Sequence, residues 1–415
     1  LKESRRLQRE CMRIGLITGE YPPMQGGLGD FTRELARALI ELGHEVAVIT
    51  SSGVASHAAD SPIRIEAIVP KWTYACWRII ADAARRLDLD VLNIQYEPAA
   101  YAMQVGVNLF PWWYRRQPNH SPVVTTFHDL LVPYLFPKAG RLRWKVVEFL
   151  ARRSDAVILT NEEDRLTLVA SNLQPPTSNL QSPTSNFQSP TSNLHLIPIG
   201  SNIPPSLPLD FDRHRERARW GASENDWLAA YFGFLGMSKG GLTLMRSIGL
   251  LVNDRLPARL LLIGGRTGSS DPTNAQYAAE VDRALASLGL HDRVRYTGYV
   301  DPMQVAAAMA AADVIALPYA DGVSFRRGSL MAALAHGKAI VTTRPRVAIP
   351  QLIDDENCVL VAPEDAGALA AGIRRVMLES GLRARLEAAA RDLAQQFTWD
   401  KIAARTADVY RGVMR

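Results

Sequence analysis

GLITGEYPPMQGGLGDFTRELARALIELGHEV, residues 15–46, is the stretch that decides the fold. A short apolar run is followed by a glycine-rich loop, an amphipathic segment and a second apolar run that begins after Gly43. The apolar side chains of the amphipathic segment recur at helical spacing: Phe31, Leu35, Ala38, Leu39 and Leu42. A strand, a helix and a second strand in this order predict a parallel βαβ unit.

The same alternation continues outward from this unit in two series of short apolar runs. The first series occupies residues 13–18, 45–50, 63–69, 90–95, 122–127 and 155–160. The second occupies residues 227–233, 258–264, 293–298, 313–318, 338–343 and 358–362. Nearly continuous apolar strands joined by helical segments are typical of parallel sheets that are covered on both faces. We therefore predict two doubly wound α/β domains.

Proline-rich residues 197–210 separate the two series and predict an extended linker. We place the N-terminal domain at 12–203, the C-terminal domain at 204–396 and a final amphipathic helix at 397–415. One face of that helix carries Phe397, Ile402, Ala403, Thr406, Val409 and Tyr410.

Two segments do not fit either domain. Residues 171–194 contain a heptapeptide three times, as SNLQPPT, SNLQSPT and SNFQSPT, and begin a fourth unit with SNL; a proline in each complete unit excludes a coiled coil. We interpret them as a tandem duplication that lengthened a surface loop; a partner-binding segment is the alternative. Residues 1–11 are basic and precede Met12, which indicates a non-native or mis-started leader without the apolar core of a secretion signal.

Composition places the chain among ordinary globular proteins. Of its 415 residues, 47% are hydrophobic and 21% are charged, and the net charge is +5. This basic balance favours phosphate-bearing ligands or an anionic membrane face, and no segment resembles a nucleic-acid-binding module. The three scattered cysteines suit a reducing compartment. We therefore expect a cytoplasmic protein, with peripheral contact at the inner membrane face as a further expectation.

Gly26, Gly27 and Gly29 directly precede the helix in the opening stretch. Without side chains they allow backbone N–H groups to approach a ligand, and a helix N-terminus attracts anions such as phosphate. A dinucleotide fingerprint does not fit, because Thr32 stands where a third glycine is required and no acidic residue ends the next strand. A tight turn that serves helix packing alone is the alternative.

The opening stretch resembles the retaining glycosyltransferases of the GT-B fold, the large family that includes sucrose-phosphate synthases and bacterial mannosyl- and glucosyltransferases. The likeness lies in EYPPxxGGLG and LGHEV and continues through TTFHD, VILTNEED, IPIGSNI, SKGG, YTGYV and the closing FTW. It covers residues 12–415 except the heptapeptide insert. It implies two Rossmann-like domains that face a cleft, with the last helix returning to the N-terminal domain.

The resemblance also implies an activity. A sugar would pass from a UDP- or GDP-linked donor to a sugar, polysaccharide or lipid-linked hydroxyl, with retention of configuration and without a metal or a further cofactor. His128, at a predicted strand end, would reach the donor sugar near the reaction centre. Acceptor contacts would come from residues along the same edge: Asp30, Gln95, Tyr96, Glu97 and Asp129.

The donor would bind the C-terminal domain, but two motifs depart from the family. Lys239 and Gly240 match its diphosphate loop, whereas Phe234 replaces a basic residue. The family's two glutamates fall on Ser324 and Ala332. We expect a rearranged pocket in which Lys239 and Asp321 take catalytic roles. The donor and its phosphates would be bound by a helix start and by Ser324, Arg326, Arg327, Gly328 and Ser329. Solvated surface arginines are the alternative. The resemblance places the base near Gly264, Gly298, Tyr299 and Val300.

Two questions stay open at the level of sequence. The missing glutamates favour a non-catalytic nucleotide-binding or sugar-phosphate-binding protein, whereas the glycine loop, His128 and Lys239 favour a transferase; an epimerase or a phosphorylase is a further alternative. Trp112, Trp113 and Tyr114, followed by Arg115 and Arg116, indicate either a patch for a lipid-linked acceptor or ordinary helix packing.

Overall fold

The computed structural model describes residues 11–24, 26–54, 62–130, 140–172, 193–265 and 273–414. The chain forms two compact units: the N-terminal unit, residues 1–199 with 399–415, and the C-terminal unit, residues 200–398. The interpretations of the leader and of the heptapeptide repeat fall on residues 1–10 and 173–192, which lie outside the described residues.

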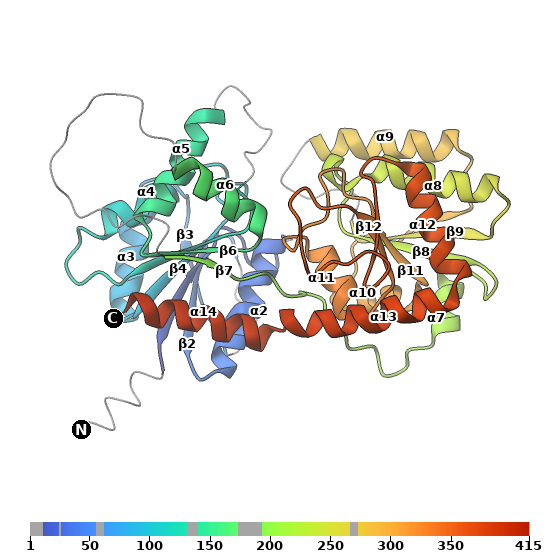
Figure 1. Ribbon diagram of the computed structural model, residues 1–415. Helices are drawn as coiled ribbons and strands as arrows, with labels where there is room; N and C mark the ends of the chain where they lie inside the picture. Colours follow the sequence, from blue (N-terminus) through green and yellow to red (C-terminus); the bar gives the residue numbers. More distant parts are fainter. Residues whose placement is uncertain are drawn as a thin grey trace. The chain divides into compact units, whose positions relative to one another are not determined.

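The N-terminal unit contains a seven-stranded parallel sheet with the order β3-β2-β1-β4-β5-β6-β7 (Figure 1). Its strands are β1 (Arg13–Ile17), β2 (Glu45–Ser51), β3 (Arg64–Val69), β4 (Val91–Tyr96), β5 (Val123–Phe127), β6 (Ala156–Leu159) and β7 (Leu194–Leu196). The first six are the strands that the apolar runs predict. The edge strand β7 was not predicted, because three residues between the repeat and the proline-rich segment are too few to show a period.

Helices cover both faces of this sheet, as a doubly wound parallel sheet requires. One core forms under α3 (Cys76–Arg86), α4 (Gly106–Tyr114), α5 (Gly140–Arg153) and α6 (Glu162–Asn172). The other forms under α2 (Gly27–Glu41) and α14 (Trp399–Val413). Neighbouring residues of β1 point to opposite cores, with Ile17 in the first and Leu16 in the second.

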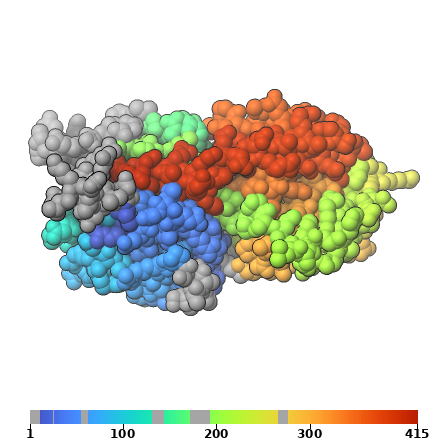
Figure 2. Space-filling model, turned by 90° about the horizontal axis from the view of Figure 1, so that it is seen from below, coloured from blue at the N-terminus to red at the C-terminus, as the bar shows by residue number. Residues whose placement is uncertain are grey.

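The last helix, α14, packs against α2, and Figure 2 shows its red atoms beside the blue of the early chain. Ile402, Ala403, Thr406, Val409 and Tyr410 are buried on one face of α14, as their spacing predicts. Phe397 is different: it lies in the 3-10 turn η5 (Gln395–Phe397) and its ring packs against Phe325 at 4.7 Å. Extended Thr398 separates the turn from the helix, so Phe397 belongs to the C-terminal unit.

The C-terminal unit contains a six-stranded parallel sheet with the order β10-β9-β8-β11-β12-β13. Its strands are β8 (Trp227–Phe232), β9 (Ala258–Ile263), β10 (Val294–Tyr296), β11 (Val314–Leu317), β12 (Ile340–Thr343) and β13 (Val359–Val361). The second series of apolar runs predicts all six. Its helices are α7 (Arg213–Arg219), α8 (Gly241–Asn253), α9 (Thr273–Ser287), α10 (Pro302–Ala311), α11 (Gly328–Ala335), α12 (Ala366–Leu378) and α13 (Ser380–Ala394), with the turn η4 (Met237–Lys239).

The strand order reverses once in each sheet, between β1 and β4 and between β8 and β11. In open parallel sheets ligands bind outside the carboxyl ends of the strands at this switch point. In the N-terminal unit this place is formed by the segments after Ile17 and Tyr96, and in the C-terminal unit by those after Phe232 and Leu317. Each unit therefore has its own candidate site at the carboxyl edge of its sheet.

Candidate functional site

The switch point of the N-terminal unit is held by close backbone packing. The hydroxyl of Tyr101 lies 3.0 Å from the carbonyl oxygen of Ile17 and 2.8 Å from that of Gln95, so it ties the ends of β1 and β4 together. A Cβ atom on Gly19 would lie 2.0 Å from the carbonyl oxygen of Ala100. Only glycine fits there, and the loop that follows β1 is thereby fixed against the loop after β4.

A carboxylate occupies the start of α2. Oε1 of Glu20 accepts hydrogen bonds from the N–H groups of Leu28 at 3.0 Å and Gly29 at 3.3 Å. A Cβ atom on Gly26 would come within 2.1 Å of the same carboxylate. Burial raises the pKa of Glu20, and these two N–H groups oppose that rise. The glycine loop therefore accommodates a side chain of the chain itself, and a phosphate at Gly26, Gly27 and Gly29 stays a prediction that must compete with Glu20.

Glu20 was not among the predicted site residues. The signal in the sequence was a carboxylate that follows a strand end and precedes a glycine-rich helix start by seven residues. Asp30, on the first turn of the same helix, is half-buried, and burial raises its pKa although Arg33 lies 3.3 Å away. Two carboxyl groups with raised pKa values thus share one end of α2.

His128 lies at the carboxyl end of β5, as predicted. Its Nε2 is 2.9 Å from Oε1 of Gln95, and its ring meets that of Phe31 edge-on at 4.5 Å. Phe31 in turn contacts Trp399 at 5.2 Å between ring centroids, so the first residue of α14 supports the site. Burial lowers the pKa of His128 to about 3, and the imidazole is therefore neutral at physiological pH.

The five residues expected on the acceptor side divide into two groups. Gln95 and Tyr96 are 0% and 4% exposed, and the hydroxyl of Tyr96 accepts a hydrogen bond from Asn108 at 2.7 Å. Their side chains face the protein interior rather than a ligand, because the last residues of a central strand are covered on both faces. The other three residues, Asp30, Glu97 and Asp129, are partly exposed, so their contact with an acceptor stays a prediction.

In the C-terminal unit, the diphosphate loop packs on the end of β11. Gly240 has φ +71°, and a Cβ atom there would lie 1.8 Å from the carbonyl oxygen of Pro318. The N–H of Ala320 donates to the carbonyl of Ser238 at 3.0 Å. These contacts bring Lys239, at the end of η4, next to the loop that carries Asp321 and the two arginines.

Tyr319 is the centre of this arrangement. Nζ of Lys239 lies 5.6 Å from the centroid of its ring, and the guanidinium carbon of Arg327 lies 5.1 Å from it. The Tyr319 hydroxyl is 2.7 Å from Oγ of Ser329, and burial raises its pKa to about 12, so it stays protonated. The fold thus brings the predicted lysine and arginine onto one aromatic ring. Tyr319 was not among the predicted site residues, because a tyrosine that follows an apolar strand is typical of the protein core.

Asp321 pairs with both predicted arginines. Its carboxylate contacts the guanidinium of Arg326 at 3.3 Å and forms a two-oxygen contact with that of Arg327. The side chains of Arg326 and Arg327 are only 4% and 9% exposed, so the alternative of solvated surface arginines is wrong. Asp321 is therefore the counter-ion of the pair. With Lys239, the cluster holds three cations and one carboxylate and remains net positive.

The two positions at which the family carries glutamates have no carboxylate that could accept hydrogen bonds from a ribose. Ala332 is fully buried within α11, whereas Ser324 is nearly buried and its Oγ accepts the N–H of Arg326 at 3.4 Å. Helix α11 starts after Arg327 without a side-chain cap, and Gly328 at its first position is exposed. The start of α11 therefore offers backbone N–H groups beside two guanidinium groups, a combination suited to an anion.

The predicted nucleotide-base region lies on the outer strands of the same sheet edge. Gly264 and Gly298 form an isolated antiparallel bridge, and the N–H of Gly264 donates to Oγ1 of Thr297 at 3.0 Å. Tyr299 is 65% exposed and Val300 is half-buried. This edge presents backbone groups and one open aromatic ring.

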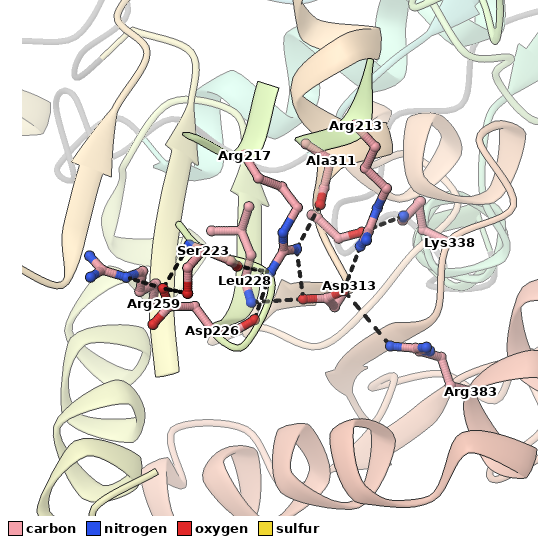
Figure 3. A network of polar contacts seen from close by, with 11 residues as sticks. Arg213, Arg217, Ser223, Asp226, Leu228, Arg259, Ala311, Asp313, Lys338 and Arg383 are labelled. Atoms are coloured by element: carbon pink, nitrogen blue, oxygen red, sulfur yellow. Dashed lines mark hydrogen bonds and ion pairs between the residues drawn. The ribbon is translucent and has the colours of Figure 1, made fainter. Parts of the chain in front are cut away.

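A second polar network of this unit lies at the opposite, amino edge of the sheet (Figure 3). Arg217 donates from one nitrogen to Asp313 at 3.0 Å and to the carbonyl of Ala311 at 3.1 Å, and Leu228 N–H donates to Asp313 at 2.9 Å. Burial is the largest influence on the pKa of Asp313 and raises it, but these donors together hold the pKa below its ordinary value. The network joins α7 to the first residues of β8 and β11 and is structural.

The predicted aromatic and basic patch is mostly helix packing. Tyr114 is buried, and Trp113 stacks on Trp77 with 5.4 Å between ring centroids. Arg116 lies over the ring of Trp112 at 4.3 Å, and Arg115 and Arg116 are exposed.

In the described part of the chain, no helix is both long and apolar enough to cross a bilayer. Across the described ranges, no group of three or more His, Cys, Asp or Glu side chains is arranged to hold a metal ion.

Comparison with known proteins agrees with this architecture. Residues 25–176 match the family described as Glycosyltransferase Family 4, and residues 228–379 match Glycosyl transferases group 1. The chain belongs to the GT-B glycosyltransferases. The match to Glycosyl transferases group 1 covers the switch point of the C-terminal unit, whereas the match to Glycosyltransferase Family 4 begins after β1 and includes the start of α2 and the ends of β4 and β5.

Individual glycosyltransferases show the same relationship. The chain is 26% identical to the phosphatidyl-myo-inositol mannosyltransferase of Mycolicibacterium smegmatis over 97% of this chain and 94% of that protein. It is 31% identical to the D-inositol 3-phosphate glycosyltransferase of Xylanimonas cellulosilytica, over 52% of this chain and 51% of that protein.

Solved structures extend the likeness to the whole fold. The sucrose-phosphate synthase of Thermosynechococcus elongatus has a TM-score of 0.71 at 22% identity, with 97% and 98% of the two chains covered. Anabaena HepE in complex with UDP and glucose has a TM-score of 0.72 at 17% identity, with 96% and 98% covered.

Proposed function

We propose that this glycosyltransferase moves a sugar from a nucleoside-diphosphate sugar to a hydroxyl acceptor, with retention of the anomeric configuration and without a metal. The observation that carries the proposal is the cluster of Lys239, Tyr319, Arg326 and Arg327 at the switch point of the C-terminal unit. Anabaena HepE is described in complex with UDP and with UDP-glucose, which supports a nucleotide-sugar donor here.

The cluster has the chemistry that a departing diphosphate needs. Negative charge grows on the leaving group as the bond to the sugar breaks, and fixed cations lower that barrier. Lys239 supplies a point charge and Arg327 a planar fork of donors that matches phosphate oxygens. Both side chains lie on Tyr319, so they are held in place before the donor arrives. These groups can neutralise the diphosphate in the role that a divalent cation plays elsewhere.

The remaining predicted roles follow from this assignment. Neutral His128 would contact a hydroxyl of the donor sugar, and Asp30, Glu97 and Asp129 would meet the acceptor. The base, uracil or guanine, would lie along Gly264, Gly298 and Tyr299. We also propose a cytoplasmic location with peripheral contact to an anionic membrane face through Arg115 and Arg116, which co-sedimentation with anionic and neutral vesicles tests.

The deciding experiment is a panel of UDP- and GDP-sugars with the full chain, in which free nucleotide and the glycosylated product are measured with and without a chelator. Release that persists in the chelator supports the proposal, and the anomeric configuration of the product by NMR tests retention. Tight nucleotide binding with no release from any donor identifies a binding protein instead. Arg327→Ala should weaken nucleotide affinity at least tenfold (roughly 1.5 to 3 kcal/mol for a charge-assisted bond), whereas exposed Arg246→Ala on α8 should not.

A further inference from the structure

A row of buried polar side chains runs from His128 back into the sheet of the N-terminal unit. Asn93 and Gln95 are two residues apart on β4 and therefore lie on the same face of the sheet. Thr126 is on the neighbouring strand β5, directly opposite Gln95 in the register. Asn93 and Gln95 are fully buried and Thr126 nearly so. Polar groups this deep destabilise a fold unless they are hydrogen-bonded.

The four side chains form one connected series of hydrogen bonds. Nε2 of His128 lies 2.9 Å from Oε1 of Gln95. The amide nitrogen of Gln95 donates to Oδ1 of Asn93, and the amide nitrogen of Asn93 donates to Oγ1 of Thr126 at 3.1 Å. Oγ1 of Thr126 also donates to Oδ1 of Asn93 at 3.2 Å. The direction of the series is therefore set by Gln95, which turns its amide oxygen toward His128 and its amide nitrogen toward Asn93.

This direction decides where the proton of the imidazole resides. A carbonyl oxygen can only accept, so the Nε2 that faces Oε1 of Gln95 must carry hydrogen, and in a neutral ring Nδ1 then keeps its lone pair. We propose that Gln95, Asn93 and Thr126 are positioning residues that hold His128 in its Nε2–H tautomer and present Nδ1 as an acceptor for a sugar hydroxyl. The sugar contact rests on the proposed function, whereas the tautomer does not.

Two further observations make the tautomer consequential. The ring of His128 is held edge-on by Phe31, which Trp399 supports in turn, so the direction of Nδ1 is set by packing. Burial lowers the pKa of His128 to about 3, so the ring is neutral and one nitrogen must be an acceptor at any pH near 7. Rotating both amides together would reverse the series, because the Thr126 hydroxyl can donate or accept, and would leave His128 with hydrogen on Nδ1.

The two directions are distinguished by long-range ¹H–¹⁵N correlation spectra of the full chain labelled at histidine nitrogen. The chain has eight histidines, and the spectrum of His128→Gln identifies the signals of His128 by their loss. We expect hydrogen on Nε2 at neutral pH. Hydrogen on Nδ1, or a doubly protonated ring, overturns the proposal.

Variants of Gln95 separate positioning from packing. Gln95→Met keeps the length but removes the acceptor, and we expect a mixture of tautomers and a kcat that falls about tenfold, the value of one hydrogen bond. Gln95→Glu keeps an acceptor and should retain the Nε2–H tautomer. An unchanged tautomer in Gln95→Met refutes the role of Gln95; if that variant does not fold, Thr126→Val supplies the same comparison at the far end of the series. If no donor is turned over, the proposed function fails while the spectra still decide the tautomer.

Discussion

Replacement of Asp321 by asparagine is expected to destabilise the C-terminal unit and at the same time to strengthen its response to a diphosphate. Asp321 is the carboxylate that pairs with both Arg326 and Arg327, whose side chains are almost fully buried. An asparagine keeps the shape and one acceptor oxygen but removes the charge. Two buried guanidinium groups then face each other without a counter-ion.

The magnitude follows from the burial of the three side chains. Removing one partner of a fully buried ion pair costs about 3–5 kcal/mol, because the other charge is left uncompensated. Asp321 is 19% exposed, and the asparagine oxygen retains one hydrogen bond, so we expect a value at or just below the lower end of that range. The expected loss in the free energy of unfolding is about 2–3 kcal/mol. Nucleotide should recover part of it, since only a chain with the pocket formed binds the anion.

The assay is urea denaturation of the full chain followed by fluorescence, with and without saturating UDP or GDP. Asp254→Asn is the matched control, because Asp254 pairs with Arg374 on the exposed surface of the same unit and such pairs contribute about 1 kcal/mol or less. The result that refutes the reasoning is a stability equal to that of the control. A loss of stability with no larger nucleotide effect than in the wild type would instead separate the ion pair from the proposed donor site.

Three other changes test separate parts of the structure. The pKa of Asp313 is lowered in the fold, so its contribution to folding stability is present above the ordinary aspartate pKa of about 4 and is lost as the pH falls through the folded value. In denaturation experiments, Asp313→Asn should be less stable than the wild type at pH 7, and the two free energies of unfolding should converge at strongly acidic pH. An equal difference at both pH values would contradict this. Gly26→Ala should push the Glu20 carboxylate away from the start of α2 and cost about 1 kcal/mol, the value of a helix cap, which thermal unfolding measures; no loss would show that the contact is dispensable. Tyr410→Ala removes a fully buried ring of α14 and should cost about 3 kcal/mol or more, with a loss below 1 kcal/mol counting against the docking of this helix.

Strand positions could be predicted because each depends on a local pattern. Apolar runs such as those that became β4 and β9 are read directly from neighbouring residues, and the structure confirms them to within a residue or two. The failures were places where local pattern is weak or interrupted. The three residues of β7 carry no period, and Phe397 shares the spacing of the helix that follows it although extended Thr398 separates the two.

At the sites, the sequence indicated the residue types and the structure decided their partners. Lys239 and Arg327 were predicted to serve one phosphate, but their shared contact with Tyr319 depends on packing between a loop and a strand about eighty residues apart in the chain. Glu20 and Gln95 belong to the sites because of tertiary hydrogen bonds that the spacing of residues in the sequence does not predict. Whether a side chain faces a ligand or another side chain depends on the tertiary contact.

By itself, the sequence determined two doubly wound sheets, the order of their strands along the chain and the edges at which chemistry is expected, since hydrophobic period and glycine placement act over a few residues. Only the tertiary structure decided that Asp321 pairs with both arginines, that the Glu20 carboxylate lies at the start of α2 and that His128 ends a buried series of hydrogen bonds. Charges and hydrogen bonds act through space, between atoms that folding brings within a few ångströms, so these contacts exist only after the strands have taken their places.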